Sequence, residues 1–201
     1  MSYSNFQIRD IIKKFAITLN ERSNLFADIV DVEYSEHLAF TIQENLTLAV
    51  TINTEKSRSE MIITPILLEL RRQLNYQISL FSGKDFHVDP EQGLNGICDY
   101  LISLSPEQLL ICSPVIAVVE AKKEDIISGL GQCIAEMIAA QIFNQQEENN
   151  IKTIYGVVTS GTNWRFLKIE ETTVYIDNVE YYIKDIGKIL GILKSCLRNC
   201  L

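Results

Sequence analysis

The apolar run at residues 115–119, which ends in Glu120-Ala121-Lys122, constrains the fold of this chain more than any other stretch. It follows Pro114, and its unbroken apolar character predicts a β-strand that is buried on both faces of a sheet. Residues two apart in a strand point the same way, so we expect Glu120 and Lys122 to project together. Burying a carboxylate and an ammonium group is costly unless they pair, hydrogen-bond or bind a metal ion.

Two interpretations of this charged pair remain open when only three residues are considered. One is a structural ion pair where the strand ends, which is common in folded proteins. The other is a functional site. The order of polar residues around the pair favours the second interpretation.

Composition sets the class of protein. The chain has 201 residues, 47% of them hydrophobic and 22% charged, with only four prolines, which predicts a single globular domain over residues 1–201. The N-terminus lacks the basic start and apolar core of a signal peptide, and no apolar run reaches the length of a membrane span. We therefore expect a cytoplasmic protein that does not interact with membranes.

Cysteine and histidine usage argues against zinc and histidine chemistry. No two cysteines form a Cys-x-x-Cys pair, and their number is odd, which predicts reduced thiols at Cys98, Cys112, Cys133, Cys196 and Cys200. The two histidines, His37 and His87, are not near a cysteine cluster. The chain thus has few residues that could bind zinc or serve as a catalytic histidine in a hydrolase.

The charge balance argues against a broad nucleic-acid-binding surface. The net charge is −8 and the pI is about 4.8, whereas phosphate binding favours a basic surface. A local basic cleft remains possible within an acidic chain, and divalent cations would offset acidic side chains. The candidates for such a cleft are Arg58, Arg71, Arg72, Lys84, Lys122, Lys123 and Arg165.

Hydrophobic patterning predicts a helical cap at residues 1–55, a core at 56–170 and a C-terminal strand and helix at 171–201. A helix over 57–74 is expected to kink at Pro65. The links between the strands that precede Glu120 are compatible with antiparallel pairing. The strand that carries Glu120 is then expected to lie in the centre of the sheet. The remaining elements are expected as strands at 76–81, 86–88, 97–104 and 115–121, a helix at 124–143, strands at 154–159, 164–169 and 173–176, and a helix at 183–197.

An aspartate within one of these strands is out of place on propensity grounds. Asp99 lies in the strand expected at 97–104, among aliphatic and aromatic neighbours. Asp89, which precedes Pro90, is a rival for a functional acid, but its surroundings are more typical of a turn. Asp99 and Asp89 are thus both candidates for an acid that accompanies Glu120.

Four polar positions in this order resemble the PD-(D/E)XK nuclease superfamily. They are Glu60 in the first helix, Asp99 in the meander, Glu120-Ala121-Lys122 in the next strand and Gln132 in the second helix. The resemblance covers residues 56–170 and implies a restriction-endonuclease-like core, an α/β fold with a mixed central sheet flanked by helices. A departure from the family pattern is Cys98, which stands where proline would precede the key acid.

Two segments add to the resemblance. Residues 96–100 (Gly-Ile-Cys-Asp-Tyr) and 157–164 (Val-Val-Thr-Ser-Gly-Thr-Asn-Trp) are similar to counterparts in the nuclease domain of type I restriction enzyme motor subunits. The whole chain also resembles uncharacterised bacterial proteins that are assigned to this fold. Without the resemblance, the segment around Trp164 has an ordinary explanation as hairpin packing.

The resemblance implies a role for each site residue. Asp99 and Glu120 would bind Mg²⁺, or alternatively Mn²⁺, with the Ala121 carbonyl, and Glu60 would complete the shell. Lys122 would position a water and neutralise developing charge. Two neighbouring acids would keep this lysine protonated, so electrostatic support is expected rather than general-base catalysis.

The second helix contributes an accessory residue under the same resemblance. Gln132 would help to position the lysine or the backbone, and Glu136 shares its helical face. Each assignment has a structural alternative: Glu60 as a first-turn acid of a helix, and Gln132 as a buried amide bonded to the backbone.

The sequence thus supports a Mg²⁺-dependent nuclease acting on DNA, with Asp99, Glu120 and Lys122 as the minimum catalytic set. The alternative is a catalytically inactive protein of the same fold that serves as an interaction or regulatory partner. A third possibility is a nuclease subunit that gains specificity from a protein partner or by forming a homodimer.

Overall fold

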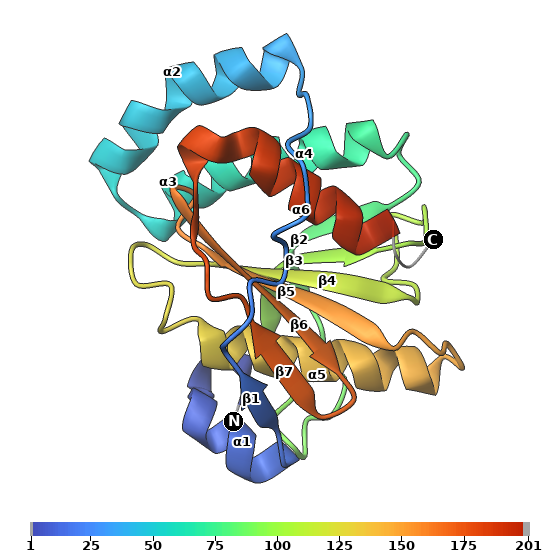
Figure 1. Ribbon diagram of the computed structural model, residues 1–201. Coiled ribbons are helices and arrows are strands. Elements are labelled where there is room, and N and C mark those ends of the chain that lie inside the picture. Colours follow the sequence, from blue (N-terminus) through green and yellow to red (C-terminus); the bar gives the residue numbers. More distant parts are fainter. Residues whose placement is uncertain (1, 199–201) are drawn as a thin grey trace.

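The computed structural model describes residues 2–198 and places a mixed β-sheet between two layers of helices (Figure 1). The sheet has eight strands in the order β1-β7-β6-β5-β4-β3-β2, with β8 paired to β6. The predicted α/β fold, a mixed central sheet flanked by helices, is confirmed. The strands are β1 (Thr18–Asn20), β2 (Ser79–Asp85), β3 (Ile97–Ser103), β4 (Val115–Ala121), β5 (Thr153–Thr159), β6 (Asn163–Glu170), β7 (Thr173–Ile176) and β8 (Tyr181–Tyr182).

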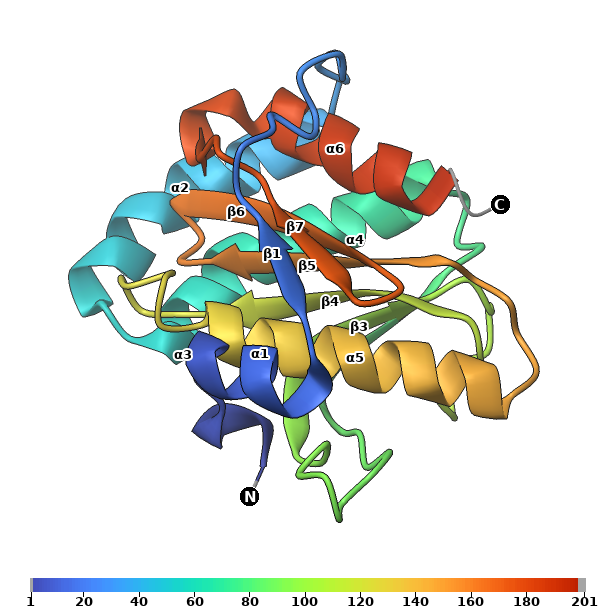
Figure 2. The same ribbon diagram turned by 60° about the horizontal axis from the view of Figure 1, so that its bottom comes forward.

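Helices cover both faces of the sheet, each over its own hydrophobic cluster. Helices α2, α4 and α6 lie on one side, and α1 and α5 lie on the other (Figures 1 and 2). The helical elements are η1 (Tyr3–Asn5), α1 (Ile8–Phe15), α2 (Glu36–Ile52), α3 (Glu55–Arg58), the π-helical segment η2 (Ser59–Ile63), α4 (Thr64–Gln73), α5 (Leu130–Gln146), η3 (Ile183–Asp185) and α6 (Ile186–Arg198).

Strand β4 lies inside the sheet, as its apolar sequence predicts. Strands β2, β3 and β4 form an antiparallel meander, and β4 pairs in parallel with β5 on its other side. All seven residues of β4 are buried. The connection from β4 to β5 runs through α5, which packs against both strands. This arrangement explains the continuous apolar run, because helices cover both faces of the strand.

The segment predicted as an N-terminal helical cap, residues 1–55, is divided among three places. Elements η1 and α1 pack against α5, whereas α2 packs against η2, α3 and α4 across the sheet. Between them β1 pairs in parallel with β7 at the edge of the sheet (Figure 2). A strand of three residues is too short to show a period in the sequence, so the pattern could not reveal it.

The first helix and the early strands differ from prediction in detail. The helix expected at 57–74 begins at Glu55 and contains the π-helical segment just before Pro65, where a kink was expected. The strand expected at 76–81 begins and ends later than predicted, since β2 runs from Ser79 to Asp85. A strand at 86–88 is also wrong, because this stretch leads only to an isolated bridge between Asp89 and Leu94.

The second helix begins later than predicted. Residues 124–129 precede α5 as a turn, in which Asp125 Oδ1 accepts hydrogen bonds from the backbone N–H groups of Ile127 and Ser128. Glu124 and Asp125, which fall within the predicted helix, thus lie in the loop that joins β4 to α5.

The cysteines that the structure describes form no disulfide: Cys98, Cys133 and Cys196 are buried and Cys112 is half-buried. Cys200 lies outside the described residues. Within residues 2–198, no helix combines the length and apolar character needed to cross a membrane.

Candidate active site

The candidate site lies where β3 and β4 diverge. Their backbone pairing ends at Tyr100 and Val119. Beyond that point the N–H of Ala121 donates to the Oδ2 atom of Asp99 at 2.8 Å. The aspartate side chain therefore replaces a strand partner for a buried N–H group, which otherwise would need another acceptor. This gives Asp99 a place beside the end of β4, as the sequence predicts.

Glu120 and Lys122 project together, as the period of a strand requires. Glu120 is 1% exposed, and its Oε1 atom accepts a hydrogen bond from Lys122 Nζ. Its Oε2 atom accepts from Gln132 Nε2 at 2.8 Å, and Gln132 Oε1 lies 3.4 Å from Lys122 Nζ. Strand β4 and the first turn of α5 thus hold three side chains in one closed network, and the predicted convergence of Gln132 on the pair is present.

A fourth polar residue extends this network into the core. The Nε2 atom of Gln132 also donates to Glu136 Oε1 at 3.1 Å. Glu136 is fully buried, and its Oε2 atom has no hydrogen-bond partner among residues 2–198. A buried, unpartnered oxygen disfavours ionisation, so this carboxyl group is expected to hold a proton.

The acids of the site have raised pKa values. Burial and the charge of Asp99 raise the pKa of Glu120 to about 8, against the opposing effect of Lys122. Burial also raises the pKa of Asp99, although the Ala121 N–H and the charge of Lys122 oppose it. For Glu136, burial and the nearby Glu120 raise the pKa well above its ordinary value. The cluster therefore binds protons near neutral pH, or a cation in their place.

Lys122 has the opposite environment. Burial lowers its pKa, but the charge of Glu120 and their hydrogen bond, together with Glu55 and Asp99, outweigh burial and raise it. The ammonium group thus remains charged at neutral pH. Its chemistry is that of a fixed positive charge rather than a base, as expected from the sequence.

A pocket of about 270 Å³ opens beside Asp99. Glu60 lies on its rim: the side chain is 62% exposed and forms an ion pair with Lys56 at 3.8 Å. The structure therefore does not bring Glu60 into the network of Glu120. The charged residues that line this pocket are the acids Glu55, Glu60 and Asp99 and the cation Lys56.

Glu55 is a second acid of the first helix, and the sequence pattern did not predict its role. Burial raises its pKa, the charge of Lys122 lowers it and the charge of Asp99 raises it, and Glu55 lines the same pocket as Asp99. The signal for it is Thr54, whose side chain accepts a hydrogen bond from the N–H of Ser57 at 3.0 Å. This cap starts the helix at Glu55, two residues before the start that we expected at residue 57.

The oxygen donors of the site are of the kind that Mg²⁺ prefers, namely the carboxylates of Asp99 and Glu120 and the Ala121 carbonyl. Among residues 2–198, no group of three or more His, Cys, Asp or Glu side chains is arranged to hold a metal ion. Asp99 faces the pocket, but both oxygens of Glu120 are bonded within the protein. The donors fit a divalent cation in chemistry, provided that Glu120 exchanges one of its present partners for the cation.

The predicted basic cleft is not formed by the arginines. Arg58 is buried and donates to the Ser160 carbonyl at 3.0 Å. The other three also contact protein groups: Arg71 with the Ile78 carbonyl, Arg72 with Glu69 and Arg165 with Glu180. Of the cations proposed for the cleft, Lys84 and Lys123 are exposed.

The two remaining sequence candidates have structural roles. Asp89 accepts hydrogen bonds from the backbone N–H and the side-chain amide of Gln92, at 3.0 and 2.7 Å, and is a turn residue. Trp164 is fully buried and donates to the Gly161 carbonyl at 2.9 Å, so it packs the hairpin as expected.

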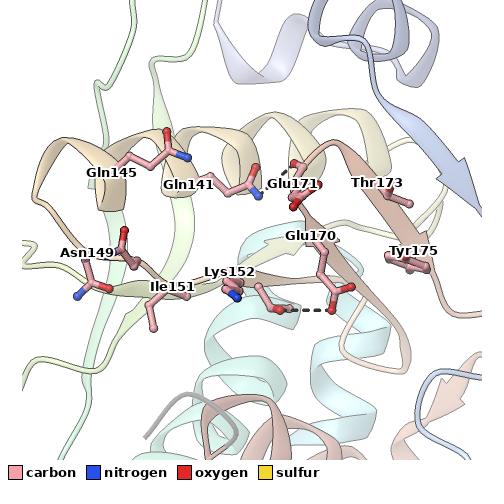
Figure 3. A pocket seen from close by; sticks show the side chains of 11 residues that line it. Gln141, Gln145, Asn149, Ile151, Lys152, Glu170, Glu171, Thr173 and Tyr175 are labelled. Atoms are coloured by element: carbon pink, nitrogen blue, oxygen red, sulfur yellow. Dashed lines mark hydrogen bonds between the residues drawn. The ribbon is translucent and has the colours of Figure 1, made fainter.

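A larger hollow, of about 820 Å³, lies elsewhere, between the C-terminal half of α5 and the turn from β6 to β7 (Figure 3). Amide side chains such as Gln141 and Gln145 line it, and its acid Glu170 pairs with Lys168 at 2.8 Å. It shares no residue with the network of Glu120. Size alone therefore does not locate the chemistry of this protein.

Comparison with known proteins gave no match among protein-family models, curated proteins or solved structures. The functional assignment therefore depends on the residues of this chain and on their geometry.

Proposed function

We propose that this protein is a divalent-cation-dependent nuclease that hydrolyses DNA phosphodiester bonds, built on a PD-(D/E)XK-like core. The observation that carries the proposal is the meeting of Asp99, Glu120 and Lys122 at the end of β4, with Gln132 bonded to the last two. A meander, a helix and a further strand surround them in the order of that superfamily. A structural ion pair alone would need neither the second acid nor the amide.

In this proposal the acids bind the cation, and the lysine stabilises charge on the substrate. Asp99 and Glu120 would hold Mg²⁺ or Mn²⁺ with the Ala121 carbonyl, and a bound cation would acidify a water and neutralise charge on the phosphate. Lys122 places a fixed positive charge beside the same carboxylates, where it stabilises negative charge that develops during hydrolysis. Gln132 orients both Lys122 and Glu120 through its amide. In the first helix, the charges of Lys122 and Asp99 act on the pKa of Glu55, whereas Glu60 pairs with Lys56.

Calorimetric titration with Mn²⁺ or Mg²⁺ tests the site directly. The proposal predicts binding to the wild-type protein that Asp99→Ala or Glu120→Ala abolishes, and DNA cleavage that disappears with it. Binding and cleavage that survive both substitutions would show that the site lies elsewhere.

One observation favours the second candidate, an inactive protein of this fold that acts as an interaction or regulatory partner. Both oxygens of Glu120 are occupied by Lys122 and Gln132, and the arginines form no basic cleft. This candidate predicts no cation binding that depends on Asp99 and Glu120. A homodimer or another protein partner would then supply the function, and the same titration separates the two candidates.

A further inference from the structure

Lys122 directly follows β4, and hydrogen bonds hold this residue at both ends. Its backbone N–H donates to the Thr159 carbonyl of β5 at 2.8 Å. Its ammonium group donates to Glu120 and lies 3.4 Å from Gln132 Oε1. The four-carbon stem between these ends is flexible by itself. Contacts along the stem therefore help to decide where the positive charge lies.

One such contact comes from Gly129, the residue directly before α5. A Cβ atom added at Gly129 would lie 3.0 Å from Lys122 Cε and 3.1 Å from Lys122 Cγ. It would also lie 2.7 Å from Cγ1 of Val158, a fully buried residue of β5. Carbon atoms that are not bonded prefer separations of about 3.5–4.0 Å. The lysine stem thus occupies space that a side chain at position 129 would need.

The backbone conformation of Gly129 does not require glycine. Its φ of −81° and ψ of −14° lie in the right-handed helical region, which residues with a Cβ atom adopt without strain. Gly129 is also buried. Space for Lys122 and Val158, rather than backbone freedom, is therefore what the glycine provides at this position.

The first turn of α5 contacts Lys122 at two points. Gly129 lies against the stem, and Gln132, three residues later, reaches the ammonium group. Residues three apart are neighbours on the surface of a helix. The other partner of the ammonium group, Glu120, is buried and is held by Gln132 through its second oxygen. A displaced lysine stem would thus move the charge relative to a fixed carboxylate.

We propose that Gly129 is a positioning residue, which sets the place of the Lys122 ammonium group by leaving room for the lysine stem. This role rests on the proposed function, in which Lys122 stabilises negative charge that develops during hydrolysis. A displacement of about 1 Å near reacting atoms can cost about a hundredfold in rate. Because Lys122 acts on charge that develops in the transition state, its displacement lowers kcat more than it raises KM.

Gly129→Ala tests this role with two measurements. In DNA cleavage with Mg²⁺ we expect kcat to fall by about ten- to a hundredfold, while KM changes by less than about twofold. In protein with ¹⁵N-labelled lysine and a metal chelator, the NMR signal of the Lys122 ammonium group should shift or broaden. Lys122→Met, which loses the signal, assigns it. The NMR measurement needs no enzymatic activity.

Gly191→Ala is the matched control for overpacking. A Cβ atom added at Gly191 in α6 would lie 2.5 Å from the Val30 carbonyl oxygen. This variant should lower the Tm while it leaves kcat and the Lys122 signal unchanged. If Gly129→Ala impairs folding, the double variant with Val158→Ala removes the contact with Cγ1 and keeps the contacts with Lys122. Val158→Ala alone is then the reference.

The two measurements separate the positioning role from the proposed function. If the wild type cleaves DNA, an unchanged Lys122 signal or an unchanged kcat in Gly129→Ala would overturn the positioning role alone. If the wild type cleaves no DNA with any divalent cation, the proposed function is overturned. The Lys122 signal then still decides whether Gly129 sets the place of the lysine.

Discussion

Glu136 buries a carboxyl group whose Oε2 atom has no hydrogen-bond partner among residues 2–198. Burial and the charge of Glu120 raise its pKa well above the ordinary value of 4.5. As the pH rises above that value, the unfolded chain releases this proton before the folded protein does. The stability contributed by protonated Glu136 is thus present at low pH and is lost progressively as the pH rises.

We therefore predict that Glu136→Gln stabilises the protein at neutral pH by about 1–3 kcal/mol, because the amide cannot ionise. Near pH 4 the variant and the wild type should have equal free energies of unfolding. Urea unfolding at several pH values, in a metal chelator, measures the difference. Glu147→Gln, at an exposed position after the same helix, is the control and should show no such pH dependence. Equal stability of Glu136→Gln and wild type at every pH would contradict this account.

Lys122 and Glu120 form a pair in which only the lysine reaches solvent, with exposed side-chain fractions of 20% and 1%. Lys122→Met leaves the buried carboxylate without its main partner. We expect a loss of about 2–3 kcal/mol of stability, less than for a fully buried pair because solvent reaches the lysine. The double variant with Glu120→Gln should recover most of this loss in a double-mutant cycle. Additive losses would mean that the two side chains are not coupled.

The positions of some site residues were predictable from the sequence, because side chains alternate between the two faces of a strand. Glu120 and Lys122 follow from the alternation of a strand, and Asp99 stands out in an apolar strand. Glu55 was not predictable by spacing alone, since the choice between it and Glu60 depends on where the helix starts. That start is fixed by the Thr54 cap, in which Thr54 and Ser57 each accept a hydrogen bond from the other's backbone N–H.

At the scale of elements, the docking of α5 on β5 sets the position of Gln132. Gly156 in β5 lies directly under this helix: an added Cβ would come within 2.9 Å of Cys133 Sγ and would overlap Met137 Sδ. Cys133 adjoins Gln132 in the sequence, so any displacement of the helix also moves the amide away from Glu120. The closeness of the two elements thus supports the geometry of the site.

We predict that Gly156→Ala destabilises the protein by about 1–3 kcal/mol through overpacking and weakens cation binding in parallel. Thermal unfolding and calorimetric titration measure the two effects. Gly156→Ala with wild-type stability and wild-type cation affinity would show that α5 tolerates displacement without cost to the site.

Long patterned elements were predictable, whereas short ones were not. The strands β3 to β6 and the helix α5 follow from their apolar periods, because each buries a continuous face. The three-residue strand β1 and the two-residue strand β8 exist because neighbours offer free backbone groups at an edge. Such pairing depends on tertiary contacts, so the local sequence pattern does not predict these short strands.

At the scale of the whole molecule, the negative net charge disfavours nucleic-acid binding, whereas the residues of the site favour the proposed hydrolysis of DNA. The chain carries a net charge of −8, and the four arginines proposed for a basic cleft, Arg58, Arg71, Arg72 and Arg165, already contact protein groups. A divalent cation is then the natural source of positive charge for a nucleic-acid substrate. The net charge follows from the sequence, but only the folded structure shows which basic side chains already contact protein groups.

We accordingly predict that DNA binding requires a divalent cation and depends weakly on monovalent salt, because few lysine and arginine side chains would displace counterions from DNA. Anisotropy titrations at several salt concentrations, with Ca²⁺ and with a chelator, give both quantities. Tight binding in the chelator with a steep salt dependence would point instead to a basic surface.

The cleavage of supercoiled DNA in Mg²⁺ by the wild type, Asp99→Asn and Asp89→Asn is the measurement that tests the proposed nuclease most directly. We predict cleavage by the wild type and by Asp89→Asn, whose acid only holds a turn, and loss of cleavage in Asp99→Asn. No cleavage by any of the three, or equal cleavage by wild type and Asp99→Asn, would contradict the assignment of the site beside β4.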